Sequence, residues 1–470
     1  MKICFFSRCN LVYLYGALDS ALSNKYEIIH VAYSDNEYDI LNKKFNIPLN
    51  RITHFKHQLS NYLTKDYSNY DYKKLDEKII IQSANRFNLN LSIQADRCLK
   101  YKGYEESEKL ITALYEFWAN YFDKEKPNLI FHEMVSLSIN HLCAVAAKER
   151  NIVYTNEIQV HGLYDSNFIL ANYWGGKIKF YKNNNEDADF KKNVEKFIYD
   201  FQNKKQTVLC GGQFKNKSAI HYFLPSLKRN LYISLNKNKY PHLADYVENF
   251  LVNDTSVIQK YLNLRNYKTI KWDKFDASKK YFYYPFHLEP EAAVFYWGDG
   301  IYSNQTKLIE NIAASLPPDT YLYVKDHPHD IGYRSSEDYK KLKCINNIKL
   351  LHAQESGYEV LKNSQGVITI NGSAGFEALL LNKPVYYFGN PYYENFNNTF
   401  KIRNIRDLRD TLLQENELKS NYDNFIDFFT NTYSGNISVF YSENYHDEDN
   451  LRTIINSIDA YLNDIEREKC

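Results

Sequence analysis

The amino-acid sequence predicts an α/β protein built from two domains, each with a mostly parallel sheet. In two separate parts of the chain, short apolar runs alternate with segments of helical periodicity, and a stretch without this alternation divides the two parts. Alternating strands and helices are typical of a doubly wound, Rossmann-like domain. The length of 470 residues is sufficient for two or three domains.

Composition and charge narrow the class of protein. The net charge is only +1, which argues against a dedicated nucleic-acid-binding protein. The chain has no apolar run of 18 residues, so we expect no membrane span. Its seven cysteines are scattered without a CxxC pair, which favours a reducing compartment. We therefore expect a cytoplasmic protein, either free or held at the inner face of the cytoplasmic membrane.

Residues 1–270 are expected to form the first domain. The N-terminus resembles a signal peptide, but Arg8 and Asp19 interrupt it, and a strand over Lys2–Ser7 is the better interpretation. The other strands that we predict are Glu27–Ala32, Asn128–Phe131 and Ile152–Thr155, and the predicted helices are Ser107–Tyr121 and Ser138–Arg150.

A basic insertion is expected near residues 201–244, at the end of this domain. The stretch contains eight Lys and Arg residues, no Asp or Glu, and interleaved aromatic residues. It can be read as a face for an anionic lipid surface or a lipid-linked acceptor. It can equally be read as a solvated helical insertion, because runs of charge usually face water.

Residues 271–440 are expected to form the second domain, and residues 441–470 a helical tail. The predicted strands are Lys280–Pro285, Tyr321–Lys325, Ile348–Leu351, Gly366–Ile370 and Pro384–Phe388. The predicted helices between them are Gln305–Ser315, Gly357–Lys362 and Ala374–Leu381.

Three polar clusters follow strands of this second domain, where open α/β sheets bind ligands. The first contains Lys325, His327 and Pro328. Its two basic side chains could neutralise a nucleotide phosphate, and the proline would end the strand. The alternative is a plain polar turn, in which Asp and Pro are common.

The second cluster runs from Asn371 to Glu377 and opens a helix. Small residues such as Gly372 let a phosphate approach the backbone, and the N–H groups and dipole of the helix N-terminus attract an anion. Ser373 could cap the helix and also bond the ligand. Glu377 lies one turn further on and could reach ribose hydroxyls. The alternative is an ordinary helix start with an acid in its first turn.

The third cluster places His287 and Glu289 after the strand Lys280–Pro285. These residues could bind the sugar or base of a nucleotide between the two domains. The alternative is a turn with solvated acids.

Together, three segments resemble the bacterial capsule polysaccharide biosynthesis family, which includes retaining β-Kdo transferases. They are YYPFHLEPEA (283–292), LPPDTYLYVKDHPHD (316–330) and VITINGSAGFEALLLNKPVYYFG (367–389). DRCLKYKG (96–103) and PNLIFHE (127–133) are similar more loosely. The resemblance implies a GT-B fold, with two Rossmann-like domains facing across a cleft and a helical C-terminal tail.

The resemblance also implies how a donor would bind. In this family a His-Pro motif and a downstream serine hold the CMP part of a nucleotide-sugar, which here implies His327, Pro328 and Ser373, with Gly372 and Glu377 beside them. It implies no metal, because Lys325, His327 and the helix N-terminus would meet the phosphate charge. No cofactor is expected besides the nucleotide-sugar as co-substrate.

A catalytic carboxylate is expected from the first domain. Glu133 is the first candidate, because it ends a predicted buried strand and could deprotonate an acceptor hydroxyl or attack the anomeric carbon. His132 is a rival base, and Asp96, Glu157 and His161 are further options. The alternative for Glu133 is an acid near a helix N-cap.

We therefore expect a metal-independent glycosyltransferase that moves a sugar from a nucleotide-activated donor to a growing capsule or lipopolysaccharide. The best guess for the donor is CMP-Kdo or a related CMP-linked acid sugar, and the acceptor would be an oligosaccharide or lipid-linked glycan. A nucleotide-sugar 2-epimerase of the same fold and a non-catalytic component of polysaccharide export or assembly are the alternatives.

Overall fold

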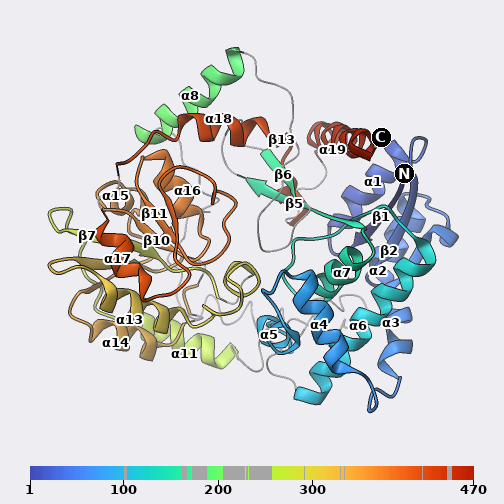
Figure 1. The fold of residues 1–470 in the computed structure, drawn as a ribbon, viewed down its shortest axis with the longest axis horizontal. Coiled ribbons are helices and arrows are strands. Elements are labelled where there is room, and N and C mark those ends of the chain that lie inside the picture. Colours follow the sequence, from blue (N-terminus) through green and yellow to red (C-terminus); the bar gives the residue numbers. More distant parts are fainter. Residues whose placement is uncertain are drawn as a thin grey trace.

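The computed structural model of this chain describes residues 1–99, 103–160, 163, 167–171, 188–204, 228, 231, 235, 257–289, 292–328, 330–332, 334–414, 417–441 and 447–469. Two sheets with their helices form two lobes, each lobe drawn mainly from one half of the sequence (Figure 1). The predicted α/β class with two Rossmann-like domains is thereby confirmed.

The sheet of the first domain has the strand order β13-β6-β5-β4-β1-β2-β3. Neighbouring strands from β3 to β5 are parallel, whereas β6 is antiparallel to both β5 and β13. The strands are β1 (Lys2–Ser7), β2 (Glu27–Ala32), β3 (Ile52–His54), β4 (Leu129–Phe131), β5 (Val153–Val160), β6 (Asn167–Ala171) and β13 (Tyr433–Ser434).

Helices cover both faces of this sheet, so its central strands are apolar along their whole length. In β1, for example, every residue from Ile3 to Phe6 is fully buried. The helices are α1 (Leu11–Leu22), α2 (Asp35–Asp39), α3 (Phe55–Leu63), α4 (Tyr72–Gln82), α5 (Leu89–Ala95), α6 (Tyr104–Glu125), α7 (Ser138–Glu149) and α19 (Glu448–Lys469).

The sheet of the second domain has the order β12-β11-β10-β7-β8-β9, and all its pairs are parallel. Its strands are β7 (Tyr281–Pro285), β8 (Tyr321–Lys325), β9 (Ile348–Leu351), β10 (Val367–Thr369), β11 (Val385–Tyr387) and β12 (Thr399–Lys401). The first strand of the domain, β7, lies beside the fourth, β10. This is the doubly wound order, whose direction reverses between β7 and β10.

The helices of the second domain lie along these strands and beside them. They are α8 (Ala188–Gln202), α11 (Val257–Tyr267), α12 (Ala292–Phe295), α13 (Gln305–Ser315), α14 (Ser336–Lys343), α15 (Gly357–Lys362), α16 (Ser373–Leu380), α17 (Asp407–Leu413) and α18 (Tyr422–Thr430).

The structure divides the chain between the domains differently from the prediction. Helix α8, expected in the first domain, packs with α16 and α18 in the apolar core of the second (Figure 1). Conversely, β13 and α19 return to the first domain, where α19 packs against α1. The predicted boundaries at residues 270 and 440 follow the alternation of strand and helix patterns, and that alternation does not show which core an amphipathic helix covers.

The two domains touch through a short segment of the second. Arg86 forms an ion pair with Asp299, with Nε 2.6 Å from Oδ1. The ring of Tyr296 packs against Phe87 and His141 of the first domain, at centroid distances of 5.5 and 5.4 Å. This buried contact fixes the end of α12 on the first domain.

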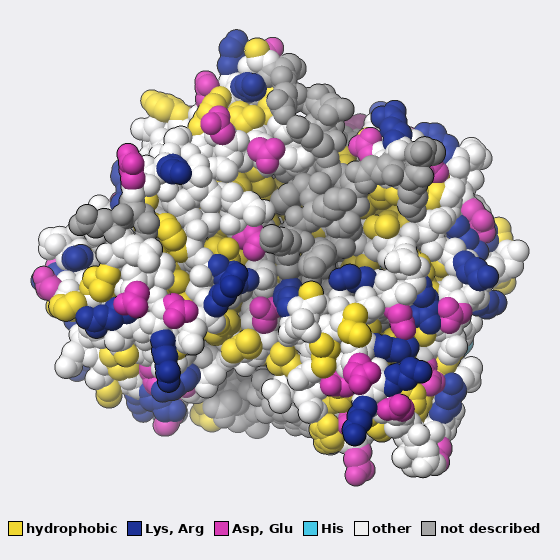
Figure 2. Space-filling model, in the orientation of Figure 1, with side chains coloured by type: hydrophobic (Ala, Val, Ile, Leu, Met, Phe, Trp, Pro, Cys, Tyr) yellow, Lys and Arg dark blue, Asp and Glu magenta, His cyan; other side chains and the backbone are white. Residues whose placement is uncertain are grey.

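Among the helices in the described ranges, none is both long and apolar enough to cross a membrane. Acidic and basic side chains are interspersed over the described part of the face in Figure 2. Of the predicted basic insertion, all but residues 201–204, 228, 231 and 235 lie outside the described residues.

Candidate functional site

The three polar clusters of the second domain lie at one edge of its sheet. They follow β10, β7 and β8, which are neighbours in that order. Because the strands are parallel, their carboxyl ends meet at the same edge. The edge includes the point between β7 and β10 where the strand order reverses, which is where doubly wound sheets bind ligands.

His287 joins two of these clusters. Its Nε2 lies 3.2 Å from the backbone nitrogen of Asn371 and 3.2 Å from Thr369 Oγ1, both after or within β10. A backbone N–H can only donate, so Nε2 accepts and the ring proton is on Nδ1, 3.2 Å from Gln305 Oε1. Burial lowers the pKa of His287 to about 4, which keeps the ring neutral in this arrangement.

Gln305 orients the histidine in turn. Its Oε1 accepts a hydrogen bond from the backbone nitrogen of His287 at 2.9 Å, and its Nε2 donates to the carbonyl of His287 at 3.0 Å. The prediction placed His287 in contact with a ligand. The structure places it beneath the loop of the second cluster, buried and fully engaged, so its role here is to hold that loop.

Other contacts also hold the loop Asn371–Ser373. Tyr393 donates its hydroxyl proton to the carbonyl of Gly372 at 2.6 Å. A Cβ at Gly372 would lie 3.0 Å from Thr369 Oγ1 and 3.2 Å from His287 Nε2, so a side chain there would press on the histidine. Glycine is therefore favoured at this position by space rather than by backbone angles, because a larger residue would need these side chains to shift.

Ser373 opens helix α16, and Gly372 is the N-cap. The sequence suggested that the serine hydroxyl could cap the helix, but the structure shows that it does not. It is half-exposed and makes no hydrogen bond with any residue that the structure describes. The first N–H groups of an α-helix have no partner within the helix and attract anions. An anion at this helix start would meet both a hydroxyl and these N–H groups.

Lys325 and Glu377 form a buried pair of opposite charge next to this loop. Burial lowers the pKa of Lys325, while the nearby acids, Glu377 among them, oppose that shift. Burial raises the pKa of Glu377 to about 7, and Lys325 opposes that shift. The carboxyl of Glu377 is therefore close to half-protonated at neutral pH, and its charge depends on what else lies near Lys325.

The His-Pro motif lies beside a second buried cluster. His327 and Pro328 are half-buried, and His327 is close enough to His287 to lower its pKa. In this cluster Arg334 donates hydrogen bonds to Glu289 Oε2 at 3.0 Å and to Asp330 Oδ2 at 2.7 Å. Glu289, predicted to contact a ligand, is thus held by Arg334 and by Gln305.

In the first domain, the corresponding edge carries an ion pair. Arg8 follows β1 and Glu133 follows β4, and these two strands are neighbours where the order of the first sheet reverses. Nε of Arg8 lies 2.9 Å from Glu133 Oε1, and Nη2 lies 2.5 Å from Oε2. This two-point contact fixes the orientation of the Glu133 carboxylate.

His132 lies in the core rather than at the edge. Its ring is fully buried, with its centroid 4.2 Å from that of Phe6 in an edge-on contact. Its Nδ1 accepts a hydrogen bond from the backbone nitrogen of Glu133 at 2.7 Å, and burial holds its pKa well below the ordinary value. The ring of His132 therefore faces the core and not the sheet edge at which an acceptor was expected.

The further candidates for the catalytic group are Asp96, Glu157 and His161, and their surroundings differ. Asp96 accepts hydrogen bonds from the backbone nitrogens of Ser138 and Cys98, at 2.6 and 2.7 Å, and so helps to start α7. Glu157 is buried on β5, where Tyr15 donates to Oε1 at 2.9 Å, and burial raises its pKa to about 7. His161 lies outside the described residues.

Three residues of these networks escaped the sequence prediction. Arg8 follows the first predicted strand as Glu133 follows a later one, so the same strand-end reasoning could have found it. Gln305 and Arg334 gave no such signal, because neither follows a predicted strand.

Residues 215–399 match the family model described as Capsule polysaccharide biosynthesis protein. Over this range the chain is similar to that family. The matched range includes β7, β8, β10 and the start of α16, and therefore all the polar clusters of the second domain.

Two curated relatives that match parts of this chain are also capsule polysaccharide proteins. The chain is 30% identical over 92 residues to the capsule polysaccharide export protein KpsS of Escherichia coli, which covers 19% of this chain and 24% of that protein. It is 26% identical over 208 residues to the capsule polysaccharide modification protein LipB of Neisseria meningitidis serogroup B, which covers 40% of this chain and 49% of that protein. The chain thus spans between a quarter and a half of the length of these relatives.

Two solved structures are similar at low identity. One is the β-Kdo 2,7 transferase KpsC of Thermosulfurimonas dismutans, 12% identical, with 72% of this chain and 84% of that chain covered and a TM-score of 0.32. The other is the UDP-GlcNAc 2-epimerase of Methanocaldococcus jannaschii, 13% identical, with 91% and 96% covered and a TM-score of 0.26.

Proposed function

We propose that this chain is a glycosyltransferase that transfers a sugar from a nucleotide-activated donor to a growing capsule or lipopolysaccharide. The match of residues 215–399 to the capsule polysaccharide biosynthesis family model supports this role. The observation that carries it is the start of α16, where a half-exposed serine and the helix N-terminus lie at the reversal point of the second sheet. A nucleotide phosphate suits such a place.

In this proposal the donor is CMP-Kdo or a related CMP-linked acid sugar. Ser373 and the N–H groups of α16 bind phosphate, and Lys325 and His327 balance its charge. The approach of an anion to Lys325 removes part of the stabilisation that Lys325 gives to ionised Glu377. Glu377 then takes up a proton more readily and can donate a hydrogen bond to the ligand.

The first domain supplies the acceptor side and the chemistry. Glu133 acts on the acceptor hydroxyl as a base or on the anomeric carbon as a nucleophile. Arg8 occupies both of its oxygens from one side. This contact orients the carboxylate for either role, because a base and a nucleophile both act through an oxygen lone pair and each oxygen has two.

Thermal melting with CMP, UDP and GDP tests donor binding. A ligand at a hundred times its Kd stabilises the native state by about 2.7 kcal/mol. We expect CMP to raise the melting midpoint, and Ser373→Ala and Lys325→Met to reduce the rise. Lys349→Met, on the neighbouring strand β9, is the matched control. If no nucleotide shifts the midpoint, the proposal is wrong.

Mass spectrometry then tests the reaction. CMP-Kdo, CMP-sialate and UDP-hexoses are offered with and without a panel of glycan acceptors, and we expect product only from a CMP donor with an acceptor present. Turnover of a UDP-sugar without acceptor would instead indicate a 2-epimerase. In cells, capsule production that survives replacement of both His327 and Ser373 would indicate a non-catalytic export or assembly role.

A further inference from the structure

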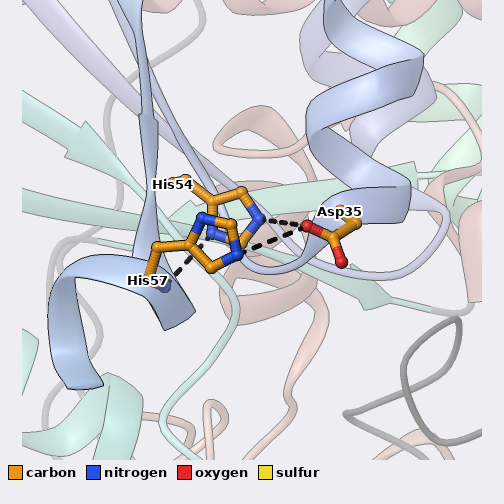
Figure 3. Close-up of side chains that lie close together, drawn as sticks. All are labelled: Asp35, His54 and His57. Atoms are coloured by element: carbon orange, nitrogen blue, oxygen red, sulfur yellow. Dashed lines mark hydrogen bonds and ion pairs between the residues drawn. The ribbon is translucent and has the colours of Figure 1, made fainter.

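A cluster of two imidazoles and a carboxylate lies at the carboxyl edge of the first sheet, apart from the polar clusters above. Asp35 follows β2, and His54 ends β3. These strands are parallel neighbours in which Ala32 pairs with His54, so the segments after them meet. His57 lies one turn further on, in α3 (Figure 3).

The three potential ligand atoms lie within 4.8 Å of one another. Nε2 of His54 is 2.9 Å from Asp35 Oδ1, and Nε2 of His57 is 3.6 Å from the same oxygen. The two imidazole rings are stacked, with centroids 3.7 Å apart and planes 11° from parallel. Both Nε2 atoms therefore point toward the same carboxylate (Figure 3).

We propose that Asp35, His54 and His57 bind a divalent transition-metal ion of the Zn²⁺ class. Ligands at 2.0–2.1 Å from a tetrahedral Zn²⁺ are about 3.3 Å apart, between the two distances in this cluster. Imidazole nitrogens favour Zn²⁺, Cu²⁺ or Ni²⁺, whereas Mg²⁺ and Ca²⁺ prefer sites made only of oxygen. Three protein ligands leave a fourth position open to water or to another ligand.

The neighbouring helix starts leave these side chains available. Ser34 and Glu37 form the capping box of α2, so the Asp35 carboxylate is not needed as a cap. His54 Nδ1 accepts a long, 3.3 Å hydrogen bond from the backbone nitrogen of His57. Metal binding through Nε2 moves the ring proton to Nδ1 and gives up this bond, at a cost of about 1 kcal/mol. That cost is small beside the free energy of metal binding by three ligands.

The site lies on the side of the first domain that carries Glu133. The ring of Tyr33 lies 5.9 Å from the Arg8 guanidinium and 5.7 Å from the Lys56 ammonium, between the ion pair and the start of α3. The side chains of Asp35 and His57 are largely exposed, at 63% and 72%. An ion here is therefore open to solvent and to a ligand on this edge.

Calorimetric titration of the full, tag-free chain with Zn²⁺ tests the proposal, with the visible absorption of bound Co²⁺ as a second readout of geometry. We expect His57→Ala and Asp35→Asn to weaken one Zn²⁺ site by at least about tenfold, since even residues that only support a metal ligand cost that much. Asp39→Asn, an exposed carboxylate on the same helix, is the matched control and should leave the affinity unchanged.

Two results would overturn the proposal. One is wild-type protein that binds no Zn²⁺, and the other is a Zn²⁺ affinity that is the same in His57→Ala and Asp35→Asn as in wild type. The melting midpoint of each variant without metal shows whether it is folded. Because the readout is metal binding and not turnover, the outcome is independent of the proposed transferase activity.

Discussion

The two domains have related strand orders, but different contacts span the point where each order reverses. In the first domain a single ion pair, Arg8 with Glu133, connects the ends of β1 and β4. In the second domain a neutral histidine, His287, connects the ends of β7 and β10 and is itself held by Gln305. One contact places a charge at the sheet edge, and the other fixes the shape of a loop.

This difference fits a division of tasks. A loop whose backbone is held from below presents the same N–H groups to every ligand, which suits a constant part such as a nucleotide phosphate. A carboxylate oriented by one arginine presents a reactive group at the sheet edge. This suits a reaction with an acceptor substrate that this edge does not enclose. The following substitutions test this difference between the two domains.

Glu133→Gln should have the largest effect. Under the proposed function it removes the reacting carboxylate, and we expect turnover to fall about 10³-fold or more, roughly 4 kcal/mol of barrier. The CMP-induced rise in melting midpoint should remain. The measurement is donor consumption with acceptor, alongside melting with CMP.

Glu125→Gln is the matched control for this change. Glu125 also pairs with a basic residue of β1, Lys2, at 3.2 Å, but at the opposite edge of the sheet. Its turnover should stay within about twofold of wild type. Equal losses in both variants would show that Glu133 contributes only to stability.

Arg334→Met should have the next largest effect, on stability. It leaves Asp330 buried, and Glu289 partly buried, without their cation, and breaking a buried ion pair in this way costs about 3 kcal/mol or more. Arg8→Met leaves only one carboxylate, so its melting midpoint should fall less. Adding Glu289→Gln and Asp330→Asn to Arg334→Met should restore most of the loss. A larger loss in Arg8→Met would reverse the comparison.

Much of the fold and part of the site could be predicted from the sequence. Apolar runs predicted β1, β2 and β8 with little error. Polar residues at or near the ends of such runs placed Lys325, His327, Ser373 and Glu133 at the sheet edges, and their roles there stay predictions. The order of strands in a sheet is a tertiary property, so the sequence could not show that β7 lies between β10 and β8 or that Arg8 meets Glu133.

The direction of a side chain after a strand was also beyond the sequence. His287 and His132 both follow apolar runs, and both turned out to face the protein interior. Burial depends on what packs above each residue: the loop Asn371–Ser373 in one case, and Phe6 and Trp118 in the other. No local pattern carries that information.

Glu157→Gln should change how stability depends on pH. Burial raises the pKa of Glu157 from 4.5 to about 7, so the folded state holds a proton that the unfolded chain has released. Wild-type stability therefore falls as pH rises from about 4.5 to about 7, and the glutamine variant lacks this contribution. The glutamine variant should therefore gain stability relative to wild type as pH rises. The difference between their free energies of unfolding, variant minus wild type, should be about 2 kcal/mol higher at pH 8 than at pH 5.

Glu377→Gln provides the comparison in the second domain. Glu377 has the same raised pKa of about 7 but lies near Lys325, which glutamine would leave without its partner. We expect a smaller gain at pH 8, or a loss. Paired denaturation curves at pH 5 and pH 8 measure both variants, and equal gains would show that Lys325 has no effect on Glu377.

His287→Ala should have the smallest effect and the most specific one. The Asn371 N–H and the Thr369 hydroxyl lose their acceptor, and the loop before α16 loses its support. Because His287 is buried beneath this loop and supports it, KM for the donor should rise about tenfold, roughly 1.4 kcal/mol, with kcat nearly unchanged. His287→Gln retains an acceptor and should recover part of the loss, whereas His352→Gln, at the end of β9, should have no effect on KM. A normal KM in folded His287→Ala protein would show that the loop needs no support from β7, and the two reversal points would then differ only in charge.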